Sequence, residues 1–325
     1  MSDEIPKLRM APPESAEELA HRFDQEKRRE LLQTESNLED SLHPFRVGSV
    51  PHLNAIPLTR GLEEQILFAP PTELAKKLRA DELDGALLSV TEVLFNDRYD
   101  ILDGIAVASL GEVKSVFLAH RQPLEEVREI YCDPASLASF TLLKLLLAER
   151  NLKPEFKPLT NYADAPKCEN VFLFGDTAIE FLLANQVGQT PTPAEGTASG
   201  GACTTMTGEG AGPTTHLASG HEVWDLGTAW FELTQLPFVF AVWALRRIPN
   251  QQLRRQLREA KAFGMDTLDY IISSRSEFTL DFRKDYLGWH IHYHLGSDEK
   301  RGMAKFVELL RKHGFGPVYE PRFVS

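Results

Sequence analysis

The sequence contains little cysteine, no excess of basic residues and no long apolar run. Its three cysteines (Cys132, Cys168 and Cys203) show no paired spacing, so neither a disulfide framework nor a zinc site is expected. The 47 acidic residues outnumber the 35 basic ones, and the net charge of −12 argues against general nucleic-acid binding. No segment approaches the roughly 18 apolar residues of a membrane-spanning helix, and the acidic N-terminus lacks a signal-peptide pattern. We therefore expect a cytoplasmic globular protein with no nucleic-acid or membrane partner.

Common catalytic and cofactor motifs are missing as well. The absence of a Gly-x-Ser-x-Gly elbow, a Walker loop and an HExxH motif argues against hydrolases, kinases and metalloproteases. The glycine-rich stretch 208–212 has no strand before it and no helix after it, so it does not predict a dinucleotide site. His290, His292 and His294 would resemble metal ligands on a strand. The segment is patterned as a helix, however, in which only His290 and His294 share a face and no acidic third ligand stands at the usual spacing. We expect no metal there.

Strands and helices alternate along most of the chain, which predicts an α/β protein with a largely parallel sheet. Residues 1–44 are predicted to be a charged helical extension, either a surface helix or a partner-binding arm, and Ser15 with Glu18 fits a capping box at its start. The folded body begins at Phe45. Residues from about 186 to 220 are rich in Gly, Thr, Pro, Ala and Ser, a composition that buries little apolar surface and predicts a disordered insertion.

Three of the four tryptophans lie in one run, from Trp224 to Leu245. The part of this run from Pro237 to Ala244 is almost uninterrupted in its apolar character. Such a run predicts a strand that is buried on both faces of an α/β sheet. We therefore place this segment at the centre of the fold.

Three loops join the end of a predicted strand to the start of a predicted helix and carry small polar residues. The first contains Asn54, the second runs from Asp133 to Ser139, and the third contains Gly175 and Asp176. Ligands of open α/β sheets bind beyond the carboxyl ends of the strands, where these loops would lie. Each polar side chain also fits a plain helix cap, and that alternative stays open.

Two further serines, Ser89 and Ser115, are weaker candidates of the same kind. In the second loop, the helix N-terminus and the hydroxyls of Ser136 and Ser139 could seat a carboxylate or phosphate without added positive charge. In the third, Asp176 could be a cap, a base or a ligand of substrate hydroxyls.

Several short motifs follow one another in a characteristic order. They are Gly48-Ser49-Val50, Leu53-Asn54, Pro57-Leu58, Asp84 to Leu88, Gly111, Val113, Ser115-Val116, Phe174 to Asp176, Trp224 to Gly227 and Leu236 to Trp243. With these motifs the chain, from about Arg46 to about Phe306, resembles the chorismate dehydratases of the futalosine route to menaquinone. The last two motifs are the most specific.

The resemblance implies a two-lobed fold of the type 2 periplasmic-binding-protein kind with the substrate in the cleft between the lobes. Lobe 1 would comprise residues 45–108 and 245–325, and lobe 2 residues 109–244. The Leu236–Ala244 strand would pair beside Val113–Ala119 and form a wall of the cleft. The implied reaction converts chorismate to 3-[(1-carboxyvinyl)oxy]benzoate and water, for which we expect no metal or redox cofactor.

The resemblance also suggests roles for the candidate residues. Asn54 would orient the substrate, and Asp176 is the only candidate for a protein base, although a substrate carboxylate could itself accept the ring proton. The residues expected to bind substrate are Ser89, Ser115, Ser136, Ala138, Ser139 and Gly175.

The chain departs from the family pattern at two places. It has Leu137 and Ala138 between the two serines where the family usually has Arg and Thr, and it has His52, Ala55 and Ile56 where Tyr, Thr and a basic residue are common. The first change removes an arginine and a hydroxyl from the expected anion seat. A non-catalytic binding protein for a small aromatic or cyclic carboxylate is therefore the alternative function.

Overall fold

The computed structural model describes residues 45–133, 137–185, 215–248 and 250–325. The predicted extension 1–44, most of the predicted insertion and Ser136 lie outside these ranges. Residues 45–325 form a compact unit of their own. No helix among the described residues is long and apolar enough to cross a membrane.

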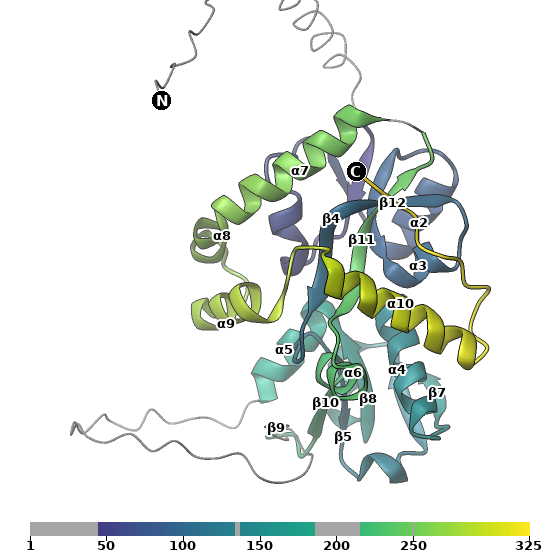
Figure 1. Cartoon of the computed structure of the whole chain (residues 1–325). Helices are drawn as coiled ribbons and strands as arrows, with labels where there is room; N and C mark the ends of the chain where they lie inside the picture. The colour runs from purple at the N-terminus through teal and green to yellow at the C-terminus, as the bar shows by residue number, and fades with distance from the viewer. Residues whose placement is uncertain (1–44, 134–136, 186–214, 249) are drawn as a thin grey trace, which may run out of the picture. The chain divides into compact units, whose positions relative to one another are not determined.

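The described chain contains two six-stranded sheets (Figure 1). In order across the first sheet, the strands are β12 (Phe323–Val324), β4 (Tyr99–Ser109), β11 (Phe238–Arg246), β3 (Gly85–Ser89), β1 (Val47–Ser49) and β2 (Ile66–Phe68). In order across the second sheet, they are β7 (Glu155–Pro158), β6 (Glu129–Cys132), β8 (Asn170–Phe174), β5 (Val116–His120), β10 (Glu222–Asp225) and β9 (Thr215–His216).

Both sheets are mixed, which corrects the expectation of largely parallel pairing. In the first sheet β1 runs parallel to β2 and β3, but β11 runs antiparallel to β3 and β4. In the second sheet β6 is parallel to β7 and β8, while β5 is antiparallel to β8 and β10. Alternation of strands and helices alone does not reveal these reversals, because β5 and β11 enter their sheets after the chain has crossed from one sheet to the other.

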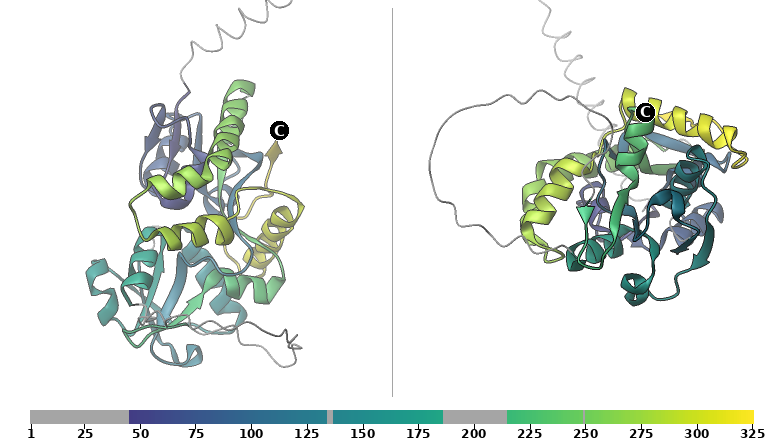
Figure 2. Two further views of the ribbon diagram at one scale, coloured as in Figure 1. Left: turned by 90° about the vertical axis from the view of Figure 1, so that its left-hand side faces the viewer. Right: turned by 90° about the horizontal axis from the view of Figure 1, so that it is seen from below.

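Helices connect and cover the strands (Figures 1 and 2). The α-helices are α2 (Pro71–Arg79), α3 (Val90–Leu94), α4 (Leu137–Glu149), α5 (Gly175–Asn185), α6 (Leu226–Thr234), α7 (Gln251–Asp266), α8 (Leu268–Ser274), α9 (Leu280–Asp285) and α10 (Ser297–Lys312). The short helical turns are η1 (Leu53–Leu58), η2 (Leu124–Glu126), η3 (Tyr162–Lys167) and η4 (Tyr286–His290). Among them α4 is apolar nearly all round and packs against α3, α6 and β11, which explains its burial.

The tryptophan-rich run forms β10, α6 and β11 in succession. Asp225 caps α6 by accepting a hydrogen bond from the Thr228 backbone N–H, 2.9 Å away, and Trp230 packs edge-on against Phe238. The predicted buried strand is present as β11, and its Trp243 is fully buried.

The predicted partner of that strand is wrong. β11 pairs with β3 and β4 of the first sheet, whereas β5 (Val116–His120) belongs to the second sheet. An apolar run specifies that a strand is central, but it does not specify the neighbour. Residues 238–244, which were predicted to belong to lobe 2, therefore lie in the first sheet with the rest of β11.

Candidate active site

A cavity of about 760 Å³, including its open mouth, lies between loops from both sheets. Its lining residues are Val50, His52, Asn54, Pro71, Leu87, Ser89, Val107, Val113, Ser115, Val116, Leu137, Ala138, Ser139, Phe174, Gly175, Phe240, Ala241 and Ile291. The wall is mostly apolar, with a few polar groups that converge on the space. This is the usual composition of a site for a small organic ligand.

The structure brings six of the eight predicted site residues to this cavity. They are Asn54, Ser89, Ser115, Ala138, Ser139 and Gly175. Asp176 does not line the space but lies beside a lining residue, and Ser136 is outside the described residues. The three predicted loops meet because η1, α4 and α5 each follow a strand end of one of the two sheets. Phe240 and Ala241 of β11 also contribute to the wall.

Asn54 takes part in a chain of hydrogen bonds that joins three segments. Its Nδ2 donates to the Tyr286 hydroxyl at 3.1 Å, and that hydroxyl donates to Ser115 Oγ at 2.8 Å. The Asn54 side chain therefore does not serve as a helix cap. Burial raises the pKa of the Tyr286 phenol well above its usual value, so the hydroxyl keeps its proton and acts as a fixed donor.

Tyr286 is a site residue that sequence reasoning missed. It belongs to η4 and is 1 % exposed, although it stands 232 positions after Asn54. The sequence carries no local signal for it, because a buried tyrosine in a helical pattern looks like an ordinary core residue.

Ser89 stands at the end of β3, where the strand gives way to α3. Its Oγ is buried and has no hydrogen-bond partner among the described residues, and it does not cap α3. A buried hydroxyl without a partner costs about 1–3 kcal/mol. Because the residue lines the cavity, Ser89 is a candidate contact for a ligand.

Gly175 and His52 face each other across one edge of the cavity. Gly175 has φ +65°, and its N–H donates to the Ser115 carbonyl at 2.7 Å. A Cβ at this position would lie 3.5 Å from the His52 ring. His52 Nδ1 lies 3.7 Å from Asp176 Oδ2, and the two side chains are 32 % and 34 % exposed. In the sequence His52 stands out only as a departure from the family pattern. Among the described residues that line the cavity, it is the one with an ionisable side chain.

The first turn of α4 forms another part of the wall. Leu137, Ala138 and Ser139 all line the cavity, and Ser139 is buried. No lysine or arginine lines the cavity in the described ranges. Positive potential for an anionic ligand would therefore come from the N-terminal end of this 13-residue helix.

Asp225 fixes the loop that carries Ser115. Its buried carboxylate accepts hydrogen bonds from the backbone N–H groups of Val113 and Lys114, the latter at 2.8 Å, as well as from Thr228. Burial raises the pKa of Asp225 to about 6, against the lowering effect of these bonds. The Lys114 ammonium in turn pairs with Asp285 at the end of α9, next to Tyr286.

Sequence comparison places the chain in a family. Residues 45–312 match a protein family described as menaquinone biosynthesis. The chain belongs to this family. It is also 32 % identical over 293 residues to the chorismate dehydratase of Thermus thermophilus, with 86 % of this chain and 100 % of the relative covered.

Solved structures share the fold at low sequence identity. Protein AF1704 of Archaeoglobus fulgidus superposes with a TM-score of 0.59 at 18 % identity, covering 83 % of this chain and 97 % of that one. The periplasmic aliphatic sulphonate binding protein SsuA of Escherichia coli gives a TM-score of 0.51 at 13 % identity, covering 86 % and 93 %. The predicted α/β fold of the periplasmic-binding-protein kind is therefore confirmed.

Proposed function

We propose that the protein is a chorismate dehydratase and that the cavity between the two sheets is its active site. The single observation that carries the activity is the identity to the Thermus thermophilus enzyme over that enzyme's whole length. In the reaction the C3–H and C4–O bonds of chorismate break, the proton and the hydroxyl leave as water, and the ring becomes aromatic. Chorismate is thus the small-molecule partner, and a cytoplasmic location fits a biosynthetic step of this kind.

Substrate binding is assigned to the groups that stand around the cavity. The N-terminal end of α4, with Ala138 and Ser139, seats one carboxylate of chorismate. The free hydroxyl of Ser89 and the hydroxyl of Ser115 supply further polar contacts. The apolar wall excludes water from the ring, so positioning contributes much of the rate enhancement.

Asn54 orients the substrate through its amide oxygen. Its amide nitrogen is already bound to Tyr286, which fixes the plane of the side chain and leaves the oxygen for a substrate hydroxyl. A side chain held in this way loses little conformational entropy when the ligand arrives.

The proton transfers are assigned to the substrate and to the His52–Asp176 pair. A carboxylate of chorismate accepts the C3 proton, and the His52 ring delivers a proton to the departing C4 hydroxyl while Asp176 holds the ring. The proton taken from C3 then passes from the carboxyl group to His52, which restores the ring and leaves water as the only other product. Asp176 acting directly as the base is the competing assignment. An Asp176→Asn variant separates the two, because loss of a direct base costs far more than loss of an orienting partner.

The activity is tested by mixing the purified full chain with chorismate and following the loss of its diene absorbance together with the mass of the product. We expect turnover without an added cofactor. A protein that binds chorismate stoichiometrically and never forms product would instead be the non-catalytic binding protein.

The Ser89 assignment has a matched control. We expect Ser89→Ala to lower kcat/KM by about tenfold, the equivalent of one lost hydrogen bond in a dry site, without lowering thermal stability. Thr91→Val also removes a buried hydroxyl without a partner, but Thr91 does not line the cavity, so this variant should keep the parent's activity. Equal activity of both variants would remove Ser89 from the site.

A further inference from the structure

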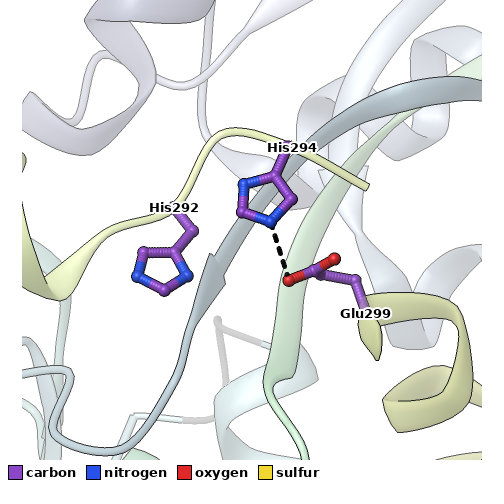
Figure 3. A group of neighbouring side chains, drawn as sticks. All are labelled: His292, His294 and Glu299. Carbon is purple, nitrogen blue, oxygen red and sulfur yellow. Dashed lines mark ion pairs between the residues drawn. The ribbon is translucent and has the colours of Figure 1, made fainter. Parts of the chain in front are cut away.

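The segment that follows η4 has a different conformation from the one expected. Residues 291–295 are not helical: Ile291 has extended backbone angles, and His292 forms an isolated antiparallel bridge with Ala108 of β4. In an extended chain residues two apart point to the same side, so His292 and His294 share a face. Their rings lie nearly parallel, 5.6 Å apart (Figure 3). The helical interpretation, which paired His290 with His294, is wrong.

An acidic side chain completes this face. Glu299, in the first turn of α10, lies opposite the two rings, and its Oε1 is 3.1 Å from His294 Nε2 (Figure 3). One ligating atom from each of the three residues falls within 4.8 Å of the others. No other group of three such residues occurs in the described part of the chain. Glu299 does not stand out in the sequence because it is not at the spacing of a ligand on the same helix as the histidines.

We propose that His292, His294 and Glu299 bind one divalent transition-metal ion of the Zn²⁺ class. Two imidazoles and one carboxylate are a ligand set that Zn²⁺ accepts, with water completing the tetrahedron. Tetrahedral bonds of 2.0–2.1 Å place ligand atoms roughly 3.4 Å apart. The His294–Glu299 pair is already close to this spacing at 3.1 Å. The His292 ligand atom lies within 4.8 Å of the other two, so a rotation of its side chain would bring both remaining distances to this value.

Neighbouring contacts hold two of the three ligands in place. Glu299 is 5 % exposed, and its second oxygen accepts the Gly296 N–H at 2.8 Å, which fixes the carboxylate and leaves Oε1 for the ion. The backbone of His292 exchanges two hydrogen bonds with Ala108 of β4, at 2.7 and 2.9 Å, which fixes the position from which its side chain extends. Outer contacts of this kind orient the side chains of metal sites. The nearest cation along the helix, Lys300, is neutralised by Asp103 at 2.7 Å.

The site is distinct from the catalytic cavity, since none of the three residues lines that space. The ion would tie the N-terminal turn of α10 to the segment that bridges β4. Its effect is therefore on stability, and the proposal stands whether or not the protein is a chorismate dehydratase.

The test uses the full chain, stripped with a chelator, and a titration with Zn²⁺ in competition with a chromophoric chelator. We expect one equivalent to bind and thermal unfolding to shift upward in its presence. His294→Ala should weaken binding by about 100-fold or more, because losing a direct ligand exceeds the 10–100-fold cost of losing a second-shell contact. The side chain is 59 % exposed, so the variant should fold as the parent does without metal.

His216→Ala is the matched control. His216 is exposed and pairs with one carboxylate, Glu222, at 3.6 Å, but has no third ligand. Its loss should leave both Zn²⁺ affinity and the metal-induced stabilisation unchanged. Equal binding by the parent and His294→Ala, or the absence of a stoichiometric site in the parent, would overturn the proposal.

Discussion

Replacing Tyr286 with Phe tests how the cavity is held together. The substitution removes one oxygen atom that accepts a hydrogen bond from Asn54 and donates one to Ser115. The ring, which stacks on Phe282 with centroids 5.4 Å apart, keeps its packing. Any effect therefore arises from the hydroxyl and from the two side chains that it orients.

The expected magnitude follows from these two bonds. Each contributes about 1 kcal/mol net, so Tyr286→Phe should lower the free energy of unfolding by about 2 kcal/mol. Catalysis should suffer separately, because Asn54 then loses its fixed plane. A loss of about 1.4 kcal/mol in transition-state binding corresponds to a tenfold lower kcat/KM.

Urea unfolding monitored by tryptophan fluorescence measures the first effect, and chorismate turnover measures the second. Tyr99→Phe is the control, because the Tyr99 hydroxyl is also buried but has no partner among the described residues. This control should lower neither the free energy of unfolding nor kcat/KM. If Tyr286 acts through Asn54, the loss of kcat/KM in Asn54→Ala should be almost unchanged by adding Tyr286→Phe. Additive losses would refute the orienting role.

Two further outcomes are expected. The Asp225 carboxyl has a pKa of about 6 in the folded protein and an ordinary value near 3.8 when the chain is unfolded, so the folded state binds the proton more tightly. The free energy of unfolding should therefore fall as pH rises from about 4 to about 6, by on the order of 3 kcal/mol. Denaturant titrations of Asp225→Asn should lack this slope; a slope that persists would assign it elsewhere. Gly302→Ala puts a Cβ 2.1 Å from the Pro237 carbonyl oxygen and should lower Tm by several degrees. Gly288→Ala is the control, because its Cβ would meet nothing within 4 Å and Tm should not change. Equal Tm values for the two variants would contradict the packing described.

The strand-end loops could be predicted from the sequence because their signals are local. A strand pattern, a glycine or proline and a polar residue mark the ends of β1, β6 and β8, and the general position of ligands in α/β folds then brings Asn54, Ser139 and Gly175 together. The contact between Asn54 and Tyr286 could not be predicted, since no local pattern specifies a hydrogen bond across 232 positions.

Two of the wrong expectations have a common physical origin. The periodicity of apolar side chains indicates whether a segment is buried and whether its repeat fits a helix or a strand. It does not indicate which distant segment pairs with it. The segment containing His292 is drawn into an extended conformation by its bridge to Ala108, against its helical pattern. In the same way β11 is central as its apolar pattern predicts, but it pairs with β3 and β4 and not with β5.

Ser115 shows how the site combines fixed groups with a free one. Its carbonyl accepts the Gly175 N–H, its hydroxyl accepts the Tyr286 proton, and Asp225 anchors the two residues before it. Three segments that are distant in sequence thus determine the position of one hydroxyl. Ser89, on the opposite sheet, has no protein partner to satisfy its own hydroxyl. A ligand that reaches both serines therefore gains one new hydrogen bond at Ser89 without breaking any, and at Ser115 it meets a donor whose direction is already set.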